Sequence, residues 1–263
     1  MRIPLFQLDS FTTTRFAGNP AAVMPVGSFP ADDVMRALAA ENNLSETAFL
    51  VPDGDGYLMR WFTPTVEVPL CGHATLASAA VVMERLEPGR QSVVFRTASG
   101  PLTVRRTDGG YVMDFPAHRS TRVEEPPGLA DALGAAPVEV WRNASNLLAV
   151  FEDASTVRAM VPDHGAVRRL TPGTTGLVVT APGDEGYDFV SRYFAPAKGI
   201  PEDPVTGGAH CTLTPYWATR TGGTRFSAYQ ASARGGSLTC TLVGERVELE
   251  GAVVFYSEGH AEV

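Results

Sequence analysis

Short apolar runs separated by glycine, proline and aspartate dominate this chain. The clearest runs are rich in β-branched and aromatic residues, and they lie at Ala21–Val26, Ala48–Val51, Ser92–Thr97 and Tyr111–Phe115. Runs of this length and composition, bounded by turn-forming residues, are typical of β-strands. The pattern therefore predicts a strand-rich protein with few helices.

Two segments have the character of helices. In Asp32–Glu41 the apolar residues Val34, Met35 and Leu38 recur with the period of one helix face. The segment Gly72–Val82 contains no charged residue at all, so a helix there has no face suited to water. We expect the first helix to lie on a surface and the second to be buried on every side.

The two halves of the chain carry similar segments in the same order. Arg60–Pro64 (RWFTP) and Arg192–Pro196 (RYFAP) are near copies, and each is followed by a glycine that begins an apolar segment. Allowing for a short insertion, Cys71–Ala74 (CGHA) lies opposite Thr206–Ala209 (TGGA). Two matches in one order favour internal duplication over coincidence.

A polar, proline-rich stretch at Pro116–Gly128 lies close to the midpoint of the chain and shows no periodic pattern. We interpret it as a linker between two lobes. The prediction is an N-terminal lobe of residues 1–117, completed by a C-terminal strand at about 251–263, and a C-terminal lobe of residues 118–250.

Charge and cysteine usage narrow the class of protein. The formal net charge is -8 and no stretch is rich in Lys or Arg, which argues against nucleic acid or a membrane surface as a partner. The chain has three cysteines, an odd number that cannot all pair, and no apolar run of the roughly 18 residues that span a bilayer. We expect a cytoplasmic protein.

Two glycine turns are candidate anion sites. Pro69–Thr75 and Asp203–Ala209 each have the pattern of a strand, a turn and the start of a helix, where unpaired backbone N–H groups meet the positive helix end. Such turns can hold a carboxylate and stabilise an enolate, although glycine also serves simply to permit a tight turn. The residues of these turns assigned to substrate binding are Gly72, Thr206, Gly207 and Gly208.

Three side chains are candidates for proton chemistry. Glu46 lies between small polar residues and an apolar strand, a position suited to a general base, although a surface glutamate has the same local sequence. His73, beside Gly72, fits a proton relay or a structural histidine. Asp203 fits either a substrate contact or a turn residue.

Several motifs occur in the order seen in the PhzF family, and together they cover essentially the whole chain. They are Gly18–Pro20 (GNP), Asn43–Phe49 (NLSETAF), Phe62–Pro64 (FTP) followed by Glu67 and Cys71–His73 (CGH), Met113–Ala117 (MDFPA) and Gly199–Gly207 (GIPEDPVTG). The chain resembles this family, which is named for the phenazine-pathway isomerase of trans-2,3-dihydro-3-hydroxyanthranilate and is similar to diaminopimelate epimerase. The resemblance implies an α+β fold of two pseudo-equivalent lobes, each a mostly antiparallel sheet or barrel around a central helix.

The resemblance also implies roles for individual residues. Glu46 would be the acid/base, His73 and Asp203 would contact substrate, and Asn19 and Ser45 would help to bind it. The implied enzyme is an isomerase or epimerase acting on a small carboxylate-bearing molecule, without cofactor or metal, and a homodimer is expected. One position departs from the family pattern, because Gly208 stands where a serine usually follows the Thr-Gly pair.

Three alternatives stay open. A two-base racemase needs an acid/base on each face of the carbon, and Cys71 has only Thr206 opposite it, so Cys71 is expected to be a small apolar filler. A metal site from His73, Cys71, His210 and Cys211 has unusual spacing for zinc. A small-acid binding protein without turnover would keep the same fold.

Overall fold

The computed structural model describes residues 2–173 and 175–263. The chain forms two compact units. The N-terminal unit comprises Met1–Asp114 together with Glu250–Val263, and the C-terminal unit comprises Phe115–Leu249. Within the described ranges, no helix is long and apolar enough to cross a bilayer.

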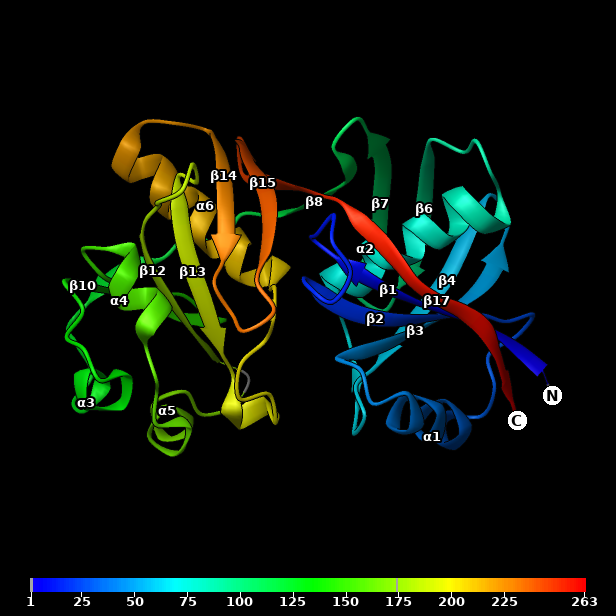
Figure 1. Ribbon diagram of the computed structural model, residues 1–263, viewed down its shortest axis with the longest axis horizontal. Helices are drawn as coiled ribbons and strands as arrows, with labels where there is room; N and C mark the ends of the chain where they lie inside the picture. The colour runs from blue at the N-terminus through cyan, green and yellow to red at the C-terminus, as the bar shows by residue number, and fades with distance from the viewer. Residues whose placement is uncertain (1, 174) are drawn as a thin grey trace. The chain divides into compact units, whose positions relative to one another are not determined.

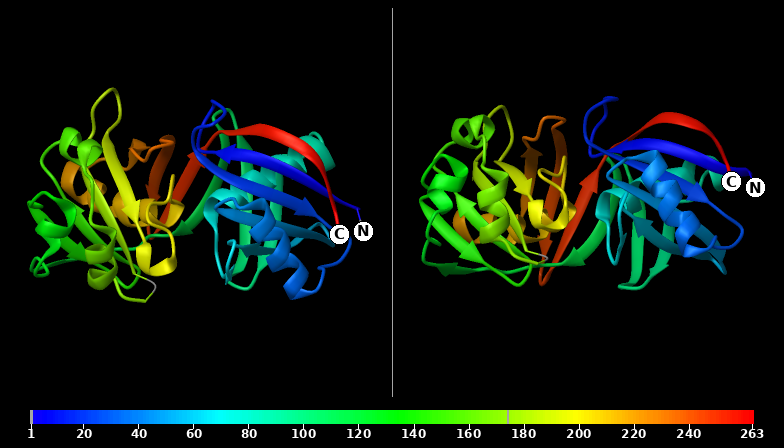
Figure 2. Two further views of the ribbon diagram at one scale, coloured as in Figure 1. Left: turned by 60° about the horizontal axis from the view of Figure 1, so that its bottom comes forward. Right: turned by 90° about the horizontal axis from the view of Figure 1, so that it is seen from below.

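The N-terminal unit is built on a mostly antiparallel sheet. Its strands are β1 (Arg2–Ser10), β2 (Asn19–Pro25), β3 (Glu46–Asp53), β4 (Gly56–Phe62), β5 (Glu67–Val68), β6 (Ser92–Thr97), β7 (Gly100–Thr107), β8 (Gly110–Pro116) and β17 (Val253–Glu262). β1 pairs antiparallel with β2 and β17, β2 pairs parallel with β3, and β3 pairs antiparallel with β4. β4 then pairs parallel with β6, and β6 antiparallel with β7. The pairing of β1 with β17 brings the two chain ends together (Figures 1 and 2).

Two helices cover this sheet in different ways. Met35 and Ala39 of α1 (Asp32–Asn42) are one helical turn apart and pack against Phe49 and Phe62. In α2 (Gly72–Val81), which continues into a π-helical turn at Val82–Leu86, every residue after Gly72 is buried. Strands β1, β2, β3, β7 and β17 all contact α2. An uncharged helix is thereby enclosed, as its sequence predicts.

The C-terminal unit repeats the same strand order. Its strands are β9 (Thr121–Val123), β10 (Glu139–Arg142), β11 (Asn146–Val150), β12 (Gly176–Pro182), β13 (Phe189–Phe194), β14 (Arg225–Gln230), β15 (Gly236–Val243) and β16 (Arg246–Gly251). The pairs from β10 to β15 alternate antiparallel, parallel, antiparallel, parallel and antiparallel, as do the pairs along β1, β2, β3, β4, β6 and β7. β9 lies within the segment interpreted as a linker and pairs with β10.

The helices of the C-terminal unit are mostly short. They are α3 (Leu129–Leu133), α4 (Ala154–Ala159), α5 (His164–Leu170), the 3-10 turn η2 (Pro196–Lys198) and α6 (Gly207–Thr221). Apolar residues of α3, α4 and α5 form one core with β11, β12 and β13.

The long helix α6 packs on the sheet through aromatic side chains. Trp217 stacks on Phe189 of β13, with ring centroids 5.7 Å apart. Pro215 lies inside α6 and has no N–H to donate to the carbonyl of Cys211. The backbone N–H of His118 donates to that carbonyl instead, at 2.9 Å. The helix therefore continues past its proline without leaving the carbonyl unpaired.

Candidate active site

A buried carboxylate and a buried imidazole meet where α2 begins. Glu46 is the first residue of β3, and His73 is the second residue of α2. Glu46 Oε2 and His73 Nε2 lie 3.1 Å apart, and the two side chains are only 10% and 6% exposed. With His73 protonated this is an ion pair shielded from water, which strengthens the attraction between the charges. The pair can hold and exchange a proton.

A thiol lies on the other side of the same imidazole. Cys71 precedes α2, and its Sγ lies 3.5 Å from His73 Nδ1. The potential ligand atoms of Glu46, Cys71 and His73 all lie within 4.8 Å of one another. A metal ion needs ligand atoms that converge on one point. Here the imidazole lies between its two partners, with one nitrogen facing each, so we interpret the cluster as a proton-bearing one.

Charges within the cluster shift its titration. Burial raises the pKa of the Cys71 thiol to about 11, helped by the charge of Glu46, so Cys71 is a neutral thiol near pH 7. Burial by itself lowers the pKa of His73, but Cys71 and Glu46 outweigh burial and hold it well above its ordinary value. Since Cys71 is neutral near pH 7, the Glu46 carboxylate is the charge that favours the imidazolium.

Neighbouring residues fix the start of α2. The Ser10 hydroxyl, at the end of β1, donates to the His73 carbonyl at 2.8 Å. Asn19 is fully buried at the start of β2, directly opposite Ser10 in the ladder, and β2 in turn pairs with the strand that Glu46 begins. Ser45 immediately precedes Glu46 and is half-buried. The residues assigned to the N-terminal half thus gather around one end of α2.

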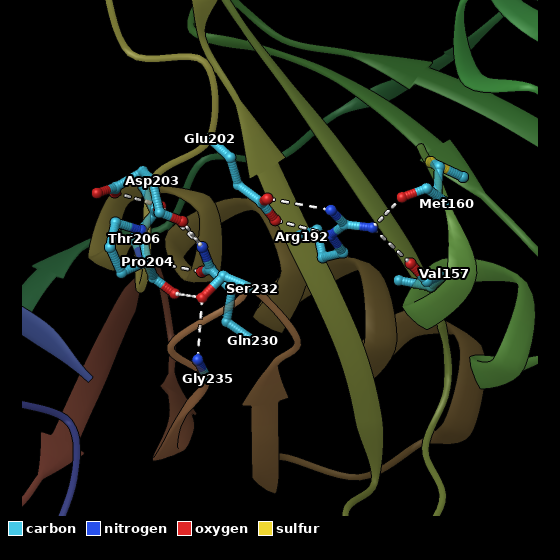
Figure 3. Close-up of polar contacts among 10 residues, drawn as sticks. All are labelled: Val157, Met160, Arg192, Glu202, Asp203, Pro204, Thr206, Gln230, Ser232 and Gly235. Atoms are coloured by element: carbon cyan, nitrogen blue, oxygen red, sulfur yellow. Dashed lines mark hydrogen bonds and ion pairs between the residues drawn. The ribbon is translucent and has the colours of Figure 1, made fainter. Parts of the chain in front are cut away.

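The residues assigned to the C-terminal half gather around the start of α6. Thr206 immediately precedes α6, and its hydroxyl donates to Asp203 Oδ2 at 2.5 Å (Figure 3). Gly207 begins the helix, and Gly208 follows it with an exposed backbone. Asp203 also influences Tyr193, whose pKa is raised mainly by burial and further by the Asp203 charge.

The sequence prediction missed Gln230. This residue is fully buried at the end of β14, and its side chain bonds to both Asp203 and Thr206. A polar residue ending an otherwise ordinary strand is the only local signal of such a role, because the contacts come from a segment that precedes it by more than 20 residues in the sequence.

Comparisons with known proteins identify the chain's relatives. A family model described as phenazine biosynthesis-like protein matches residues 8–259. The chain belongs to this PhzC-PhzF family. An uncharacterized isomerase of Pseudomonas aeruginosa is 47% identical over 259 residues, which cover 98% of each chain. The crystal structure of a PhzF-family phenazine biosynthesis protein from Enterococcus faecalis superposes with a TM-score of 0.96, at 41% identity and over 100% of both chains.

A more distant neighbour shows how widely the fold is shared. A hydroxyproline epimerase from Agrobacterium vitis has a TM-score of 0.61 at 12% identity, covering 98% of this chain and 92% of its own. That likeness concerns the fold alone. The predicted α+β, diaminopimelate-epimerase-like fold is confirmed. The chain is a PhzF-like isomerase, because it belongs to this family and its bacterial relatives are named isomerases.

Proposed function

We propose that this PhzF-family isomerase moves a proton on a small carboxylate-bearing substrate without a cofactor, with Glu46 as the acid/base. The observation that carries the proposal is the buried contact of 3.1 Å between Glu46 and His73. An acid/base must be held in place and kept from bulk water to act on a carbon-bound proton. A carboxylate paired with an imidazolium at the start of a helix satisfies both needs.

The chemistry can be written with the groups present. A Glu46 carboxylate oxygen accepts the proton as the C–H bond breaks, and the electron pair moves into an enolate conjugated with the substrate carboxylate. Backbone N–H groups at the start of α2 stabilise that negative charge, because the side chain of Cys71 does not cap them. Glu46 then returns the proton to a different carbon.

The remaining assigned residues lie in the C-terminal unit. We propose that Asp203 and the start of α6 at Thr206, Gly207 and Gly208 bind polar groups of the substrate. The substrate of the isomerase for which the family is named, trans-2,3-dihydro-3-hydroxyanthranilate, has a carboxylate and a hydroxyl that suit a helix N-terminus and a carboxylate acceptor. This compound is the first acid to test.

The experiment is exchange of solvent deuterium into a panel of acids. The panel holds trans-2,3-dihydro-3-hydroxyanthranilate, trans-4-hydroxy-L-proline and sets of amino and 2-hydroxy acids. Glu46→Gln should lower exchange by about 10²–10⁴-fold, the scale of a lost general acid/base. Glu41→Gln, at an exposed position of α1, is the matched control. Near-native exchange in Glu46→Gln, with an unchanged melting temperature, would falsify the assignment.

One observation keeps a second function in view. Gly208 lacks the serine hydroxyl of the family pattern, although a Cβ at this position would meet nothing within 4 Å. Space for a serine is therefore present while the hydroxyl is absent, as expected of a protein that binds an acid but does not turn it over. Panel acids that raise the melting temperature of the wild type without exchanging deuterium would favour this binding function.

A further inference from the structure

Gln230 uses its whole side-chain amide on one short segment. Its Oε1 accepts the backbone N–H of Thr206 at 2.8 Å, and its Nε2 donates to the Asp203 carbonyl at 2.7 Å and to Thr206 Oγ1 at 3.1 Å. Figure 3 shows these contacts converging on the start of α6. Gln230 is fully buried, so no water competes for these three bonds. The segment Asp203–Thr206 is thereby held at both ends.

The hydrogen-bond chain has a single direction. An amide nitrogen can only donate, so Thr206 Oγ1 accepts from Gln230 and is left with its one proton to give. That proton points to Asp203 Oδ2, 2.5 Å away. A donated hydrogen bond holds a carboxylate in one rotamer and favours its ionised form. Gln230 therefore sets the orientation of the Asp203 carboxylate through Thr206.

The same chain affects the start of α6. A threonine in this position ordinarily accepts a hydrogen bond from an N–H of the first helical turn. Thr206 makes no such bond, because its hydroxyl is committed to Asp203 and Gln230. The N–H groups of Gly208 and Ala209 are left without a cap from this residue. One amide thus orients a carboxylate and keeps a neighbouring helix start available to an anion.

We propose that Gln230 is a positioning residue of the isomerase, which acts on the substrate through Asp203 and Thr206. This inference rests on the proposed function and extends it to a residue outside the motifs. The alternative is that Gln230 only stabilises the fold. The two differ in one respect, because a positioning residue matters only while the carboxylate it orients is present.

A double-mutant cycle separates these roles. Gln230→Met keeps the length of the side chain and removes its donors and acceptor. In the wild type it should lower deuterium exchange into the panel acid that exchanges fastest by about 10–150-fold, the range for losing a hydrogen bond to a charged group such as the one that Thr206 gives to Asp203. In an Asp203→Asn background the same change should cost less than about twofold. Thr206→Val, which removes the relaying hydroxyl, should behave like Gln230→Met and add little to it.

The matched control is Ser232→Ala. Ser232 holds the same segment, since its hydroxyl donates to the Pro204 carbonyl at 2.8 Å, but it does not bond to Asp203 or Thr206. Both variants should lower the melting temperature, and only Gln230→Met should lower exchange in a way that depends on Asp203.

Equal losses from Gln230→Met in both backgrounds would overturn the positioning role and leave a structural one. If Gln230→Met fails to fold, equal losses from Thr206→Val in both backgrounds would do the same. Failure of the proposed function looks different, because exchange would then survive Glu46→Gln, and the inference about Gln230 would fall with it.

Discussion

In both units the same kinds of contact stabilise the segment that leads into the long helix, α2 in one and α6 in the other. In the N-terminal unit Arg60 binds both carboxylate oxygens of Glu67, at 2.7 and 2.6 Å. In the C-terminal unit Arg192 binds both oxygens of Glu202, at 2.7 and 3.0 Å (Figure 3). Each arginine lies on the repeated strand, and each glutamate lies just before the glycine turn. The repeat therefore preserves a bidentate ion pair as well as a sequence.

A second contact is preserved in the same way. The Ser99 hydroxyl donates to the Pro69 carbonyl at 2.7 Å, and the Ser232 hydroxyl donates to the Pro204 carbonyl at 2.8 Å. In both units a serine that follows the first strand after the helix, β6 or β14, therefore stabilises the turn that leads into that helix. These shared contacts form the frame of each unit.

The side chains able to carry out chemistry differ between the units. Phe62 and Phe194 are equivalent residues of the repeated segment. Thr47 pairs with Phe62 and Leu177 pairs with Phe194, so Thr47 corresponds to Leu177. The residues just before them, Glu46 and Gly176, therefore correspond as well. Any Cβ at Gly176 would collide with the hydroxyl of Tyr193. The C-terminal unit thus has no room for a second glutamate there. A shared frame carries the buried group of Glu46, Cys71 and His73 in one unit and an oriented carboxylate in the other.

The largest expected effect comes from removing the imidazole at the start of α2, which has no counterpart at the start of α6. His73→Gln leaves Glu46 without its cationic partner, and the position corresponding to His73 in the repeat is Gly208. Turnover should fall by about 10²-fold or more, because the partner that holds the base and shares its proton is lost. His260→Gln, at an exposed position of β17, is the control. Deuterium exchange measures both variants, and equal rates would contradict a role for His73.

The next effect tests whether the two ion pairs are equally important to stability. Arg192 and Glu202 are 10% and 21% exposed, whereas Arg60 and Glu67 are 26% and 40% exposed. Arg192 also donates to the carbonyls of Val157 and Met160. Removing one partner of a buried pair costs about 3–5 kcal/mol, against about 1 kcal/mol or less for an exposed pair. Urea unfolding of Arg192→Met and Arg60→Met should show this order, and equal losses would contradict it.

The sequence supported the fold more firmly than the site. The uncharged segment and the repeated glycine turns predicted helices beginning at Gly72 and Gly207, and the structure confirms both starts. Such features are local, so a single sequence contains them. The repeat also relates the two ion pairs. The alignment that places Cys71 opposite Thr206 also places Glu67 opposite Glu202, so a pairing of Arg60 with Glu67 implies a pairing of Arg192 with Glu202.

The contacts within the site could not be inferred in this way. Glu46 and His73 both lie in recognisable motifs, but their distance of 3.1 Å depends on how β3 sits beside the start of α2. The hydrogen bonds of the Gln230 side chain depend on the position of β14 beside the turn at Asp203. Tertiary packing determines both sets of contacts, and neither set produces a periodic pattern in the sequence.

A smaller effect is expected at the position where the units differ by one side chain, Cys71 in one and Thr206 in the other. Cys71 is a neutral thiol near pH 7 with a pKa of about 11, which makes it a poor base. Cys71→Ser keeps a small polar group beside His73 and should cost less than about tenfold in turnover, well short of a lost acid/base. A drop of about a thousandfold would restore the two-base racemase interpretation. Deuterium exchange on the same panel decides between these outcomes.

The smallest effect concerns the two buried histidines, one in each unit, whose charges respond to pH in opposite ways. Cys71 and Glu46 hold the pKa of His73 well above 6.5 against the effect of burial. Burial lowers the pKa of His210 to about 4, and the Thr206 carbonyl is the partner that opposes this shift. Nitrogen-15 NMR at pH 6.5 should therefore show His73 protonated and His210 neutral. An equal charge on both would contradict the difference between the units.

The opposite pKa shifts of the two histidines also determine how the stability of the protein changes with pH. The raised pKa of His73 gives a stabilisation that is fully present below about pH 6.5 and is lost as pH rises through the folded value. The depressed pKa of His210 gives one that is present above about pH 6.5 and is lost as pH falls toward 4. Glu46→Gln should reduce the pH dependence of stability that comes from His73. Glu67→Gln is the control, because it removes a partner of Arg60, which stays charged throughout. It should change stability by the same amount from pH 6 to 9. Melting temperatures of the three proteins across this range test the assignment, and parallel curves for the wild type and Glu46→Gln would show that Glu46 does not set the charge of His73.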